Sequence, residues 1–207
     1  MKCFLSSLFL ILTACSSHYK TLYPVETDQT CLQNIRPPRI ETTWFNASVD
    51  VTDRHISGLL LIKNMPDSSY RVVFTNEVGI TFFDFGFRKD GSFELKKILS
   101  HLDKRPVINT LKTDFLLLLG LYFKNDMQSW RHDGRVYYGV SHKKEIFYFV
   151  TDDQCSPVGR FEIGSARKRK VSIEFQGQAL SEPEEITIRH YTFDMVINLK
   201  KIRPVHE

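Results

Sequence analysis

Residues 70–87 read YRVVFTNEVGITFFDFGF, two runs of alternating side chains on either side of a short turn at 76–79. Side chains at every second position of a strand point to the same side, so each run predicts a strand with one buried and one wet face. The buried faces are Tyr70, Val72 and Phe74 in the first run, and Thr81, Phe83, Phe85 and Phe87 in the second. The pair predicts an antiparallel hairpin.

Two further strands precede this hairpin. Phe45, Ala47, Val49 and Val51 alternate with polar residues, and residues 58–65 form a mostly apolar run. Residues 66–69 read PDSS, a composition typical of turns. Four strands joined by short turns predict an antiparallel meander.

The apolar period then changes to that of helices. Two stripes at helical spacing follow, each short enough to need a tertiary partner. The first begins after a candidate N-cap at Ser92, and the second ends at Gly120. The stripes are Leu95, Ile98, Leu99 and Leu102, then Ile108, Leu111, Phe115, Leu118 and Leu119.

Strand patterns return from residue 135 onwards. They cover residues 135–140, 145–151, 160–165, 171–176, 186–188 and 193–199. About ten strands around a central pair of helices exclude a parallel doubly wound sheet, which needs a helix between successive strands. The predicted fold is mainly β with a central helical insert: a strongly curved antiparallel sheet with helices against its concave face. A two-sheet sandwich with a helical insert is the alternative.

The N-terminal sequence predicts the location of the protein in the cell. Lys2 precedes an apolar stretch at 4–12, and residues 12–15 read LTAC, which resembles a bacterial lipobox. We expect residues 1–14 to be a lipoprotein signal peptide, residues 15–42 a lipidated N-terminus and tether, and residues 43–207 a single domain. The alternative is an ordinary signal peptide with a chance cysteine. Ser16, by resemblance to enterobacterial lipoproteins, favours the outer membrane, with the domain facing the periplasm.

Cysteine usage fits that compartment. Cys3 leaves with the signal peptide and Cys15 carries the lipid, so Cys31 and Cys155 remain in an oxidising space. They can close a disulfide. The alternative is two separate buried thiols.

Composition and motifs exclude several classes of function. The chain has 207 residues, 42% of them hydrophobic and 25% charged, and a net charge of +4 that requires no nucleic-acid partner. It lacks HExxH, CxxC, a glycine-rich phosphate loop and GxSxG, and its seven histidines are scattered. We therefore expect no catalytic residues, no metal and no cofactor.

The order of strands, helices and strands over residues 43–202 resembles the LolA/LolB family of periplasmic lipoprotein carriers. The most local similarity is at 76–81, NEVGIT, where LolB proteins carry Asn-Pro-Leu-Gly followed by Ser-Thr. Val78 stands in the place of the leucine that those proteins use at the membrane, and Glu77 replaces the proline. The resemblance implies an incomplete barrel that encloses an apolar cavity for acyl chains.

Candidate sites follow from the resemblance and from the residues themselves. The residues proposed to line the cavity are Phe74, Phe83, Phe85, Phe115 and Met195. The alternative is that the same residues form a plain packed core. Val78 would be a membrane-contact turn. The run Arg167, Lys168, Arg169 and Lys170 would contact anionic lipid, or would simply be a solvated turn.

Two functions follow from these expectations. The first is a lipid-anchored outer-membrane lipoprotein that binds a lipid or lipoprotein acyl chain, with a role in lipoprotein localisation. Its partners would be the membrane, through the Cys15 anchor, and lipid or lipoprotein cargo. The second is a structural or protein-interaction lipoprotein of the cell envelope with no ligand.

Overall fold

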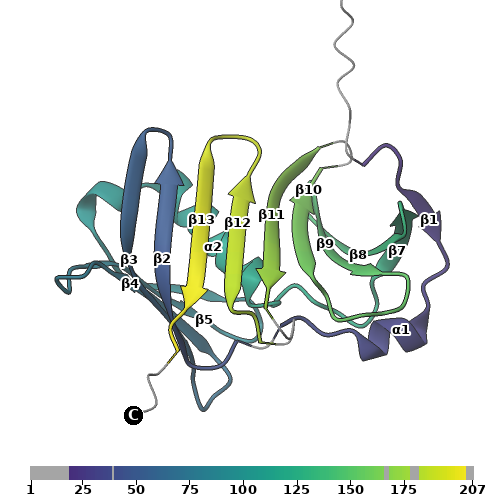
Figure 1. Ribbon diagram of the computed structural model, residues 1–207, viewed down its shortest axis with the longest axis horizontal. Helices are drawn as coiled ribbons and strands as arrows, with labels where there is room; N and C mark the ends of the chain where they lie inside the picture. Colours follow the sequence, from purple (N-terminus) through teal and green to yellow (C-terminus); the bar gives the residue numbers. More distant parts are fainter. Residues whose placement is uncertain (1–18, 39, 166–167, 178–181, 204–207) are drawn as a thin grey trace, which may run out of the picture.

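The computed structural model describes residues 19–38, 40–165, 168–177 and 182–203. Within them lies one antiparallel sheet of thirteen strands, in the order β1-β7-β8-β9-β10-β11-β12-β13-β2-β3-β4-β5-β6 (Figure 1). The strands are β1 Tyr23–Val25, β2 Thr43–Val51, β3 Arg54–Asn64, β4 Tyr70–Thr75, β5 Thr81–Phe87, β6 Phe93–Ile98, β7 Gln128–His132, β8 Arg135–His142, β9 Glu145–Asp152, β10 Arg160–Gly164, β11 Arg169–Gln176, β12 Glu185–His190 and β13 Met195–Lys201.

The sheet is strongly curved and does not close on itself, because β1 and β6 are its two edges. This confirms the predicted fold class in its curved-sheet form, and the sandwich alternative is wrong. Strands β2 to β6 form the first half of the sheet, and β1 with β7 to β12 forms the second half. Strand β13 joins the two halves. It pairs with β12 on one side and with β2 on the other, where Ile197 lies opposite Val49.

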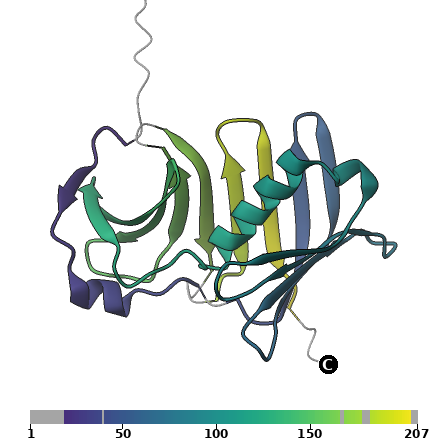
Figure 2. The same ribbon diagram turned by 180° about the vertical axis from the view of Figure 1, so that it is seen from behind.

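The predicted second helix is present. Helix α2, Arg105–Leu118, carries proline in its first turn, where the missing N–H is not needed. It ends before Gly120, whose φ of +66° is readily adopted by glycine. The helix crosses the concave face of the sheet (Figure 2) and buries Phe115 and Leu118 against it.

The predicted first helix, from Leu95 to Leu102, is wrong. Residues Phe93–Ile98 are the edge strand β6, and Ser100–Leu102 form one 3₁₀ turn. A β-bulge explains the misleading period: Leu95 and Ile98, three residues apart, lie opposite Phe85 and Phe83, two residues apart. The extra residue of the bulge turns a spacing of two into a spacing of three, which resembles a helix in the sequence.

Strands β7 to β11, in the second half of the sheet, curl around an interior space (Figure 2). Aromatic side chains fill this interior. Phe161 packs edge-on against both Phe149 and Phe175, with ring centroids 4.8 Å apart in each pair. Tyr122, from the segment after α2, stacks on Phe147 at 4.0 Å. This half is therefore a packed core.

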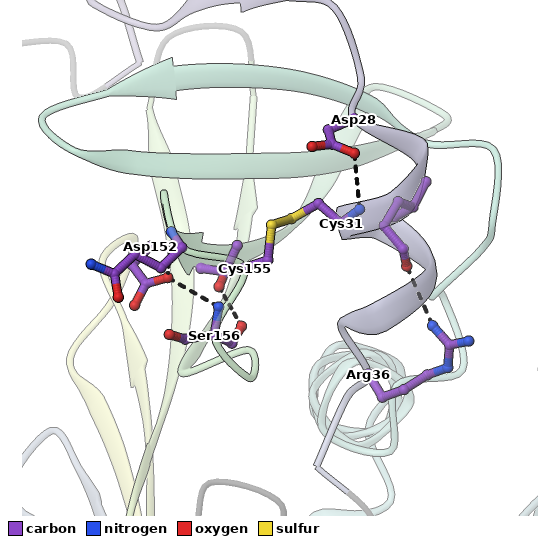
Figure 3. Close-up of a disulfide and its surroundings, with 9 residues drawn as sticks. Asp28, Cys31, Arg36, Asp152, Cys155 and Ser156 are labelled. Carbon is purple, nitrogen blue, oxygen red and sulfur yellow. Dashed lines mark hydrogen bonds between the residues drawn. A yellow bond between two sulfur atoms is a disulfide. The ribbon is translucent and has the colours of Figure 1, made fainter.

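A short helix within the predicted tether completes that core. Helix α1, Gln29–Asn34, is capped by Asp28, whose side chain accepts a hydrogen bond from the backbone N–H of Cys31. Leu32 and Ile35 are fully buried. Cys31 is joined by a disulfide to Cys155, in the loop after β9 (Figure 3). In the described part of the chain, no helix is long and apolar enough to cross a membrane.

The start of the described chain is docked on the outer face of the second half. The Tyr19 hydroxyl donates a hydrogen bond of 2.7 Å to Glu162, and its ring lies 5.0 Å from that of Tyr148. Burial, with the nearby Glu162 carboxylate, raises the pKa of Tyr19 far above its ordinary value, so the hydroxyl stays protonated and remains a donor. Glu162 is fully buried, and ion pairs with Arg160 at 2.8 Å and Arg169 at 3.1 Å compensate its charge.

Candidate functional site

The first half of the sheet and helix α2 enclose an apolar pocket. Two neighbouring strands supply its floor by simple alternation: Ala47, Val49 and Val51 of β2 point inward, and so do Met195 and Ile197 of β13. Helix α2 forms the roof.

The pocket has a volume of about 380 Å³. Among the residues that line it, only Thr110 has a polar side chain. The lining residues are Ala47, Val49, Val51, Ile56, Leu60, Phe74, Phe82, Phe83, Leu102, Pro106, Val107, Thr110, Leu111, Phe115, Phe193, Met195, Ile197 and Leu199. Such a lining offers a ligand apolar contact and almost no hydrogen bonds.

Four of the five residues proposed for a cavity line this pocket: Phe74, Phe83, Phe115 and Met195. The fifth, Phe85, is fully buried outside the lining, with its ring stacked 4.5 Å from that of Phe83. The β2 floor and the helix residues Val107, Thr110 and Leu111 also line the pocket, and they were not among the residues proposed for the cavity. The inward alternation of residues 45–51 was the signal for the floor.

The mouth of the pocket lies at one end of the strands. Its deep residues, such as Leu60 and Phe83, are buried, whereas Val51 and Ile56 beside the β2–β3 turn are partly exposed. Phe193, in the β12–β13 turn, is 45% exposed. A ligand can therefore enter between these two turns and the first turns of α2.

A buried polar pair lies beside this site. His190, at the end of β12, places Nε2 3.0 Å from Oδ2 of Asp114 on α2, and both side chains are almost completely buried. Burial raises the pKa of Asp114, and the hydrogen bond and charge of His190 act in the opposite direction. The His190 ring also packs 4.6 Å from that of Phe193. The pair therefore connects the roof of the pocket to its mouth.

The sequence alone did not identify this pair, although the helix carried a signal for it. Asp114 lies three residues from Leu111 and next to Phe115, within the apolar stripe of α2. A carboxyl group on a buried helix face needs a polar partner. Nothing in the sequence identified His190 as that partner, because the two residues come from distant elements.

The basic run is not a uniform patch of free cations. Lys168 is exposed in the β10–β11 turn, and Arg167 lies outside the described residues. Arg169 pairs with buried Glu162 and lies over the ring of Tyr191, 4.4 Å from its centroid. Lys170 places its Nζ 2.6 Å from a carboxylate oxygen of Glu145. Two of the four side chains therefore have partners within the chain.

Val78 lies at the tip of the β4–β5 turn and is 80% exposed. The turn is held by Asn76, whose side chain accepts a hydrogen bond of 2.7 Å from the backbone N–H of Ile80. Gly79, with φ +86°, completes it. Cys15 lies outside the described residues. Among those described, no group of three or more His, Cys, Asp or Glu residues is placed to hold a metal ion.

Comparisons with known proteins give a weak structural similarity. No family model matches the chain, and no curated protein matches it in sequence. Among solved structures, the chain is similar to a LolA superfamily protein from Nitrosomonas europaea, at 10% identity and a TM-score of 0.47, over 88% of this chain and 96% of the other. It is also similar to a putative outer membrane lipoprotein-sorting protein domain from Vibrio parahaemolyticus, at 8% identity and a TM-score of 0.49, over 86% and 92%. Both TM-scores are below 0.5, so what defines the fold is the strand order and register of this chain itself.

Proposed function

We propose that this protein is a lipid-anchored protein of the outer membrane that binds an acyl chain of a lipid or lipoprotein in the pocket under α2. The anchor is Cys15, and the domain faces the periplasm. Binding of acylated cargo in this pocket gives the protein a role in lipoprotein localisation. It acts as a binding protein, not as an enzyme.

The apolar pocket is the observation that carries this proposal. Its volume of about 380 Å³ lies within the range of about 300–1,000 Å³ that is typical of ligand pockets. A lining with one polar side chain cannot compensate a charged or strongly polar ligand for lost hydration. An acyl chain needs no such compensation, and each CH₂ that it buries contributes about 0.8 kcal/mol.

The test measures binding with the pocket open and with it filled. Thr110 lines the pocket from the partly exposed face of α2, so Thr110→Phe places a ring in the cavity with little effect on the rest of the fold. Thr113→Phe is the matched control, because Thr113 lies on the same helix, is also partly exposed and does not line the pocket.

Both variants are made in a Cys15→Ala background and titrated with a fluorescent fatty acid. We expect the parent and Thr113→Phe to bind the probe, and Thr110→Phe to lose at least tenfold in affinity. We also expect mass spectrometry to detect co-purified lipid in the parent and in Thr113→Phe, but not in Thr110→Phe. If the parent binds no probe and carries no lipid, the protein is a structural or interaction lipoprotein without a ligand.

A further inference from the structure

The docking of Tyr19 determines how far an acylated Cys15 can lie from the domain. A free segment over residues 15–42 would reach about 95 Å when extended. In the structure, however, Tyr19 is only 5% exposed and its hydroxyl is bonded to Glu162. Four residue steps separate Cys15 from Tyr19, so the free reach is at most about 14 Å.

Gly164 provides the space in which the Tyr19 ring packs. The ring lies on Gly164, the last residue of β10, where a Cβ atom would be 2.1 Å from Cε2 of Tyr19. Only glycine leaves this space. Tyr19, at the start of the described chain, therefore lies beside the β10–β11 turn.

That turn belongs to a continuous rim, which we call the anchor-side rim: the β2–β3, β12–β13, β10–β11 and β8–β9 turns. Backbone hydrogen bonds connect its members, from Thr52 N–H to the Asp194 carbonyl at 3.0 Å and from Tyr191 N–H to the Lys170 carbonyl at 2.8 Å. Gly164 lies opposite Ile146, which places the β8–β9 turn at the same end of the strands. The mouth of the apolar pocket opens at this rim, between Val51, Ile56 and Phe193.

The side chains of the rim fit the surface of an anionic bilayer. Tyr191 and Phe193 are 43% and 45% exposed, and aromatic rings are typical of the membrane interface. The exposed lysines Lys143, Lys144 and Lys168 lie in the turns nearest to Tyr19. Asp53 and Asp194 lie in the β2–β3 and β12–β13 turns, so the lysines of the rim are concentrated in the part of it nearest to Tyr19.

We infer that the anchor-side rim faces the bilayer that holds the acyl anchor, so that the mouth of the pocket opens onto that bilayer. The four residue steps between Cys15 and Tyr19 limit the distance from the anchor and set this orientation, and the aromatic and lysine side chains contact the headgroups. The inference rests on the proposed function, because it needs an acylated Cys15. It adds that an acyl chain passes between pocket and membrane at this rim without the domain turning over.

The two ends of β3 provide a matched pair of positions for a test. Asp53 precedes β3 at the anchor-side rim, and Ser68 lies in the turn at its other end. Ten residue steps from Arg54 to Asn64 separate these ends by about 33 Å. Because Cys31 and Cys155 are joined and Cys15 is acylated, Asp53→Cys and Ser68→Cys each introduce one reactive thiol.

The lipidated full-length protein carries a fluorophore at one position or the other, in vesicles of phosphatidylethanolamine and phosphatidylglycerol at 3:1. Nitroxide headgroup lipids then quench according to distance. We expect the Asp53→Cys label to be quenched several-fold more than the Ser68→Cys label. A third protein carries a twenty-residue Gly/Ser insertion after Ser17, and there we expect the difference to fall because the tether becomes flexible and long.

Equal quenching at the two positions in the parent, or stronger quenching at Ser68→Cys, overturns the orientation. An unchanged difference after the insertion overturns the role of the short tether. Fatty-acid binding by the same labelled proteins in a Cys15→Ala background is measured separately in solution. Absence of that binding, with the quenching pattern intact, would reject acyl-chain binding in the pocket and leave the acyl anchor and the orientation of the rim standing.

Discussion

His190 and Asp114 meet between the sheet and its covering helix, with Nε2 and Oδ2 3.0 Å apart, although 76 residues separate them in the chain. The second carboxylate oxygen of Asp114 is buried and has no hydrogen-bond partner within the described residues. An incompletely partnered buried carboxyl group favours its neutral form. The pair therefore holds α2 in place and also makes the stability of the fold depend on pH.

The pH dependence has a definite sign. Burial raises the pKa of Asp114 above its ordinary value of 3.8, so the folded state keeps this proton to higher pH than the unfolded state does. The stability linked to it is complete below about pH 4 and is lost as pH rises through the raised pKa. Asp114→Asn removes this titration, so urea unfolding should show the variant gaining stability relative to the parent as pH rises above about 4.

Asp152→Asn is the control with the opposite sign. Hydrogen bonds from Ser156 lower the pKa of Asp152, with a further contribution from the backbone N–H of Gln154 (Figure 3). Its stabilising effect is present above the unfolded pKa and is lost as pH falls. This variant should therefore lose stability relative to the parent as pH rises. The same sign for both variants would contradict the assignment.

Phenylalanines in the two halves of the sheet should respond differently to truncation. Phe149 is fully buried in the packed half, so Phe149→Ala should reduce the free energy of unfolding by about 3–5 kcal/mol. Phe83 borders the pocket and already lacks some neighbours, so Phe83→Ala should reduce it by less, and fatty-acid binding should fall. Equal losses of stability, with no change in binding, would mean that Phe83 belongs to an ordinary core.

The disulfide should contribute strongly to stability, because it closes a loop with a sequence separation of 124. On the chain-entropy model the contribution is at most about 5 kcal/mol. Thiol labelling of the denatured, unreduced protein should leave Cys31 and Cys155 unmodified, and Cys31→Ser with Cys155→Ser should lower the urea midpoint. Full labelling of either cysteine would show that the bond does not form.

Replacement of the lipobox cysteine should release the protein from membranes. We expect Cys15→Ala to move from the membrane fraction to the soluble fraction of lysed cells, because an acyl anchor with two or more chains is lost. A protein with Cys3→Ala serves as the control, since that residue precedes the cleavage site. If Cys15→Ala is retained in the membrane fraction as firmly as the parent, Cys15 does not carry the anchor.

A charge at the exposed β4–β5 turn should affect membranes and not folding. Val78 is 80% exposed, so Val78→Glu should change the melting temperature little. We expect the variant to deliver acyl probe to acceptor vesicles more slowly than the parent, because a carboxylate at this turn disfavours contact with the bilayer. Ser68→Glu, in the turn between β3 and β4, is the control and should transfer normally.

Alternation predicted ten strands, and the three that it missed lie at the two ends of the sheet. β1 and β6 are edge strands, and β7 is next to β1. Edge strands are less constrained by burial on both sides, so their apolar pattern is weaker, and in β6 a bulge also changes the period. Helix α1 was missed for a related reason: six residues are too few to show a period, and Asp28 and the packing of Leu32 define it.

The parts of the candidate site that belong to one alternating strand were predictable from the sequence. The contacts between residues far apart in the sequence were not. Phe74 and Phe83 were found because each belongs to a clear strand pattern. The pairing of Asp114 with His190, and the seating of Tyr19 on Gly164, join residues that only the folded topology brings together. No local pattern contains that information.

The position of β13 has a consequence for how the chain assembles. During folding, β2 to β6 can form one sheet and β7 to β12 another, each by pairing of neighbouring strands. Each of these sheets ends in an open hydrogen-bonding edge, β2 or β12, until residues 195–201 arrive and pair with both. Strand β13 therefore joins two sheets that can form separately, and the edges of β2 and β12 remain open to wrong pairing until it is in place.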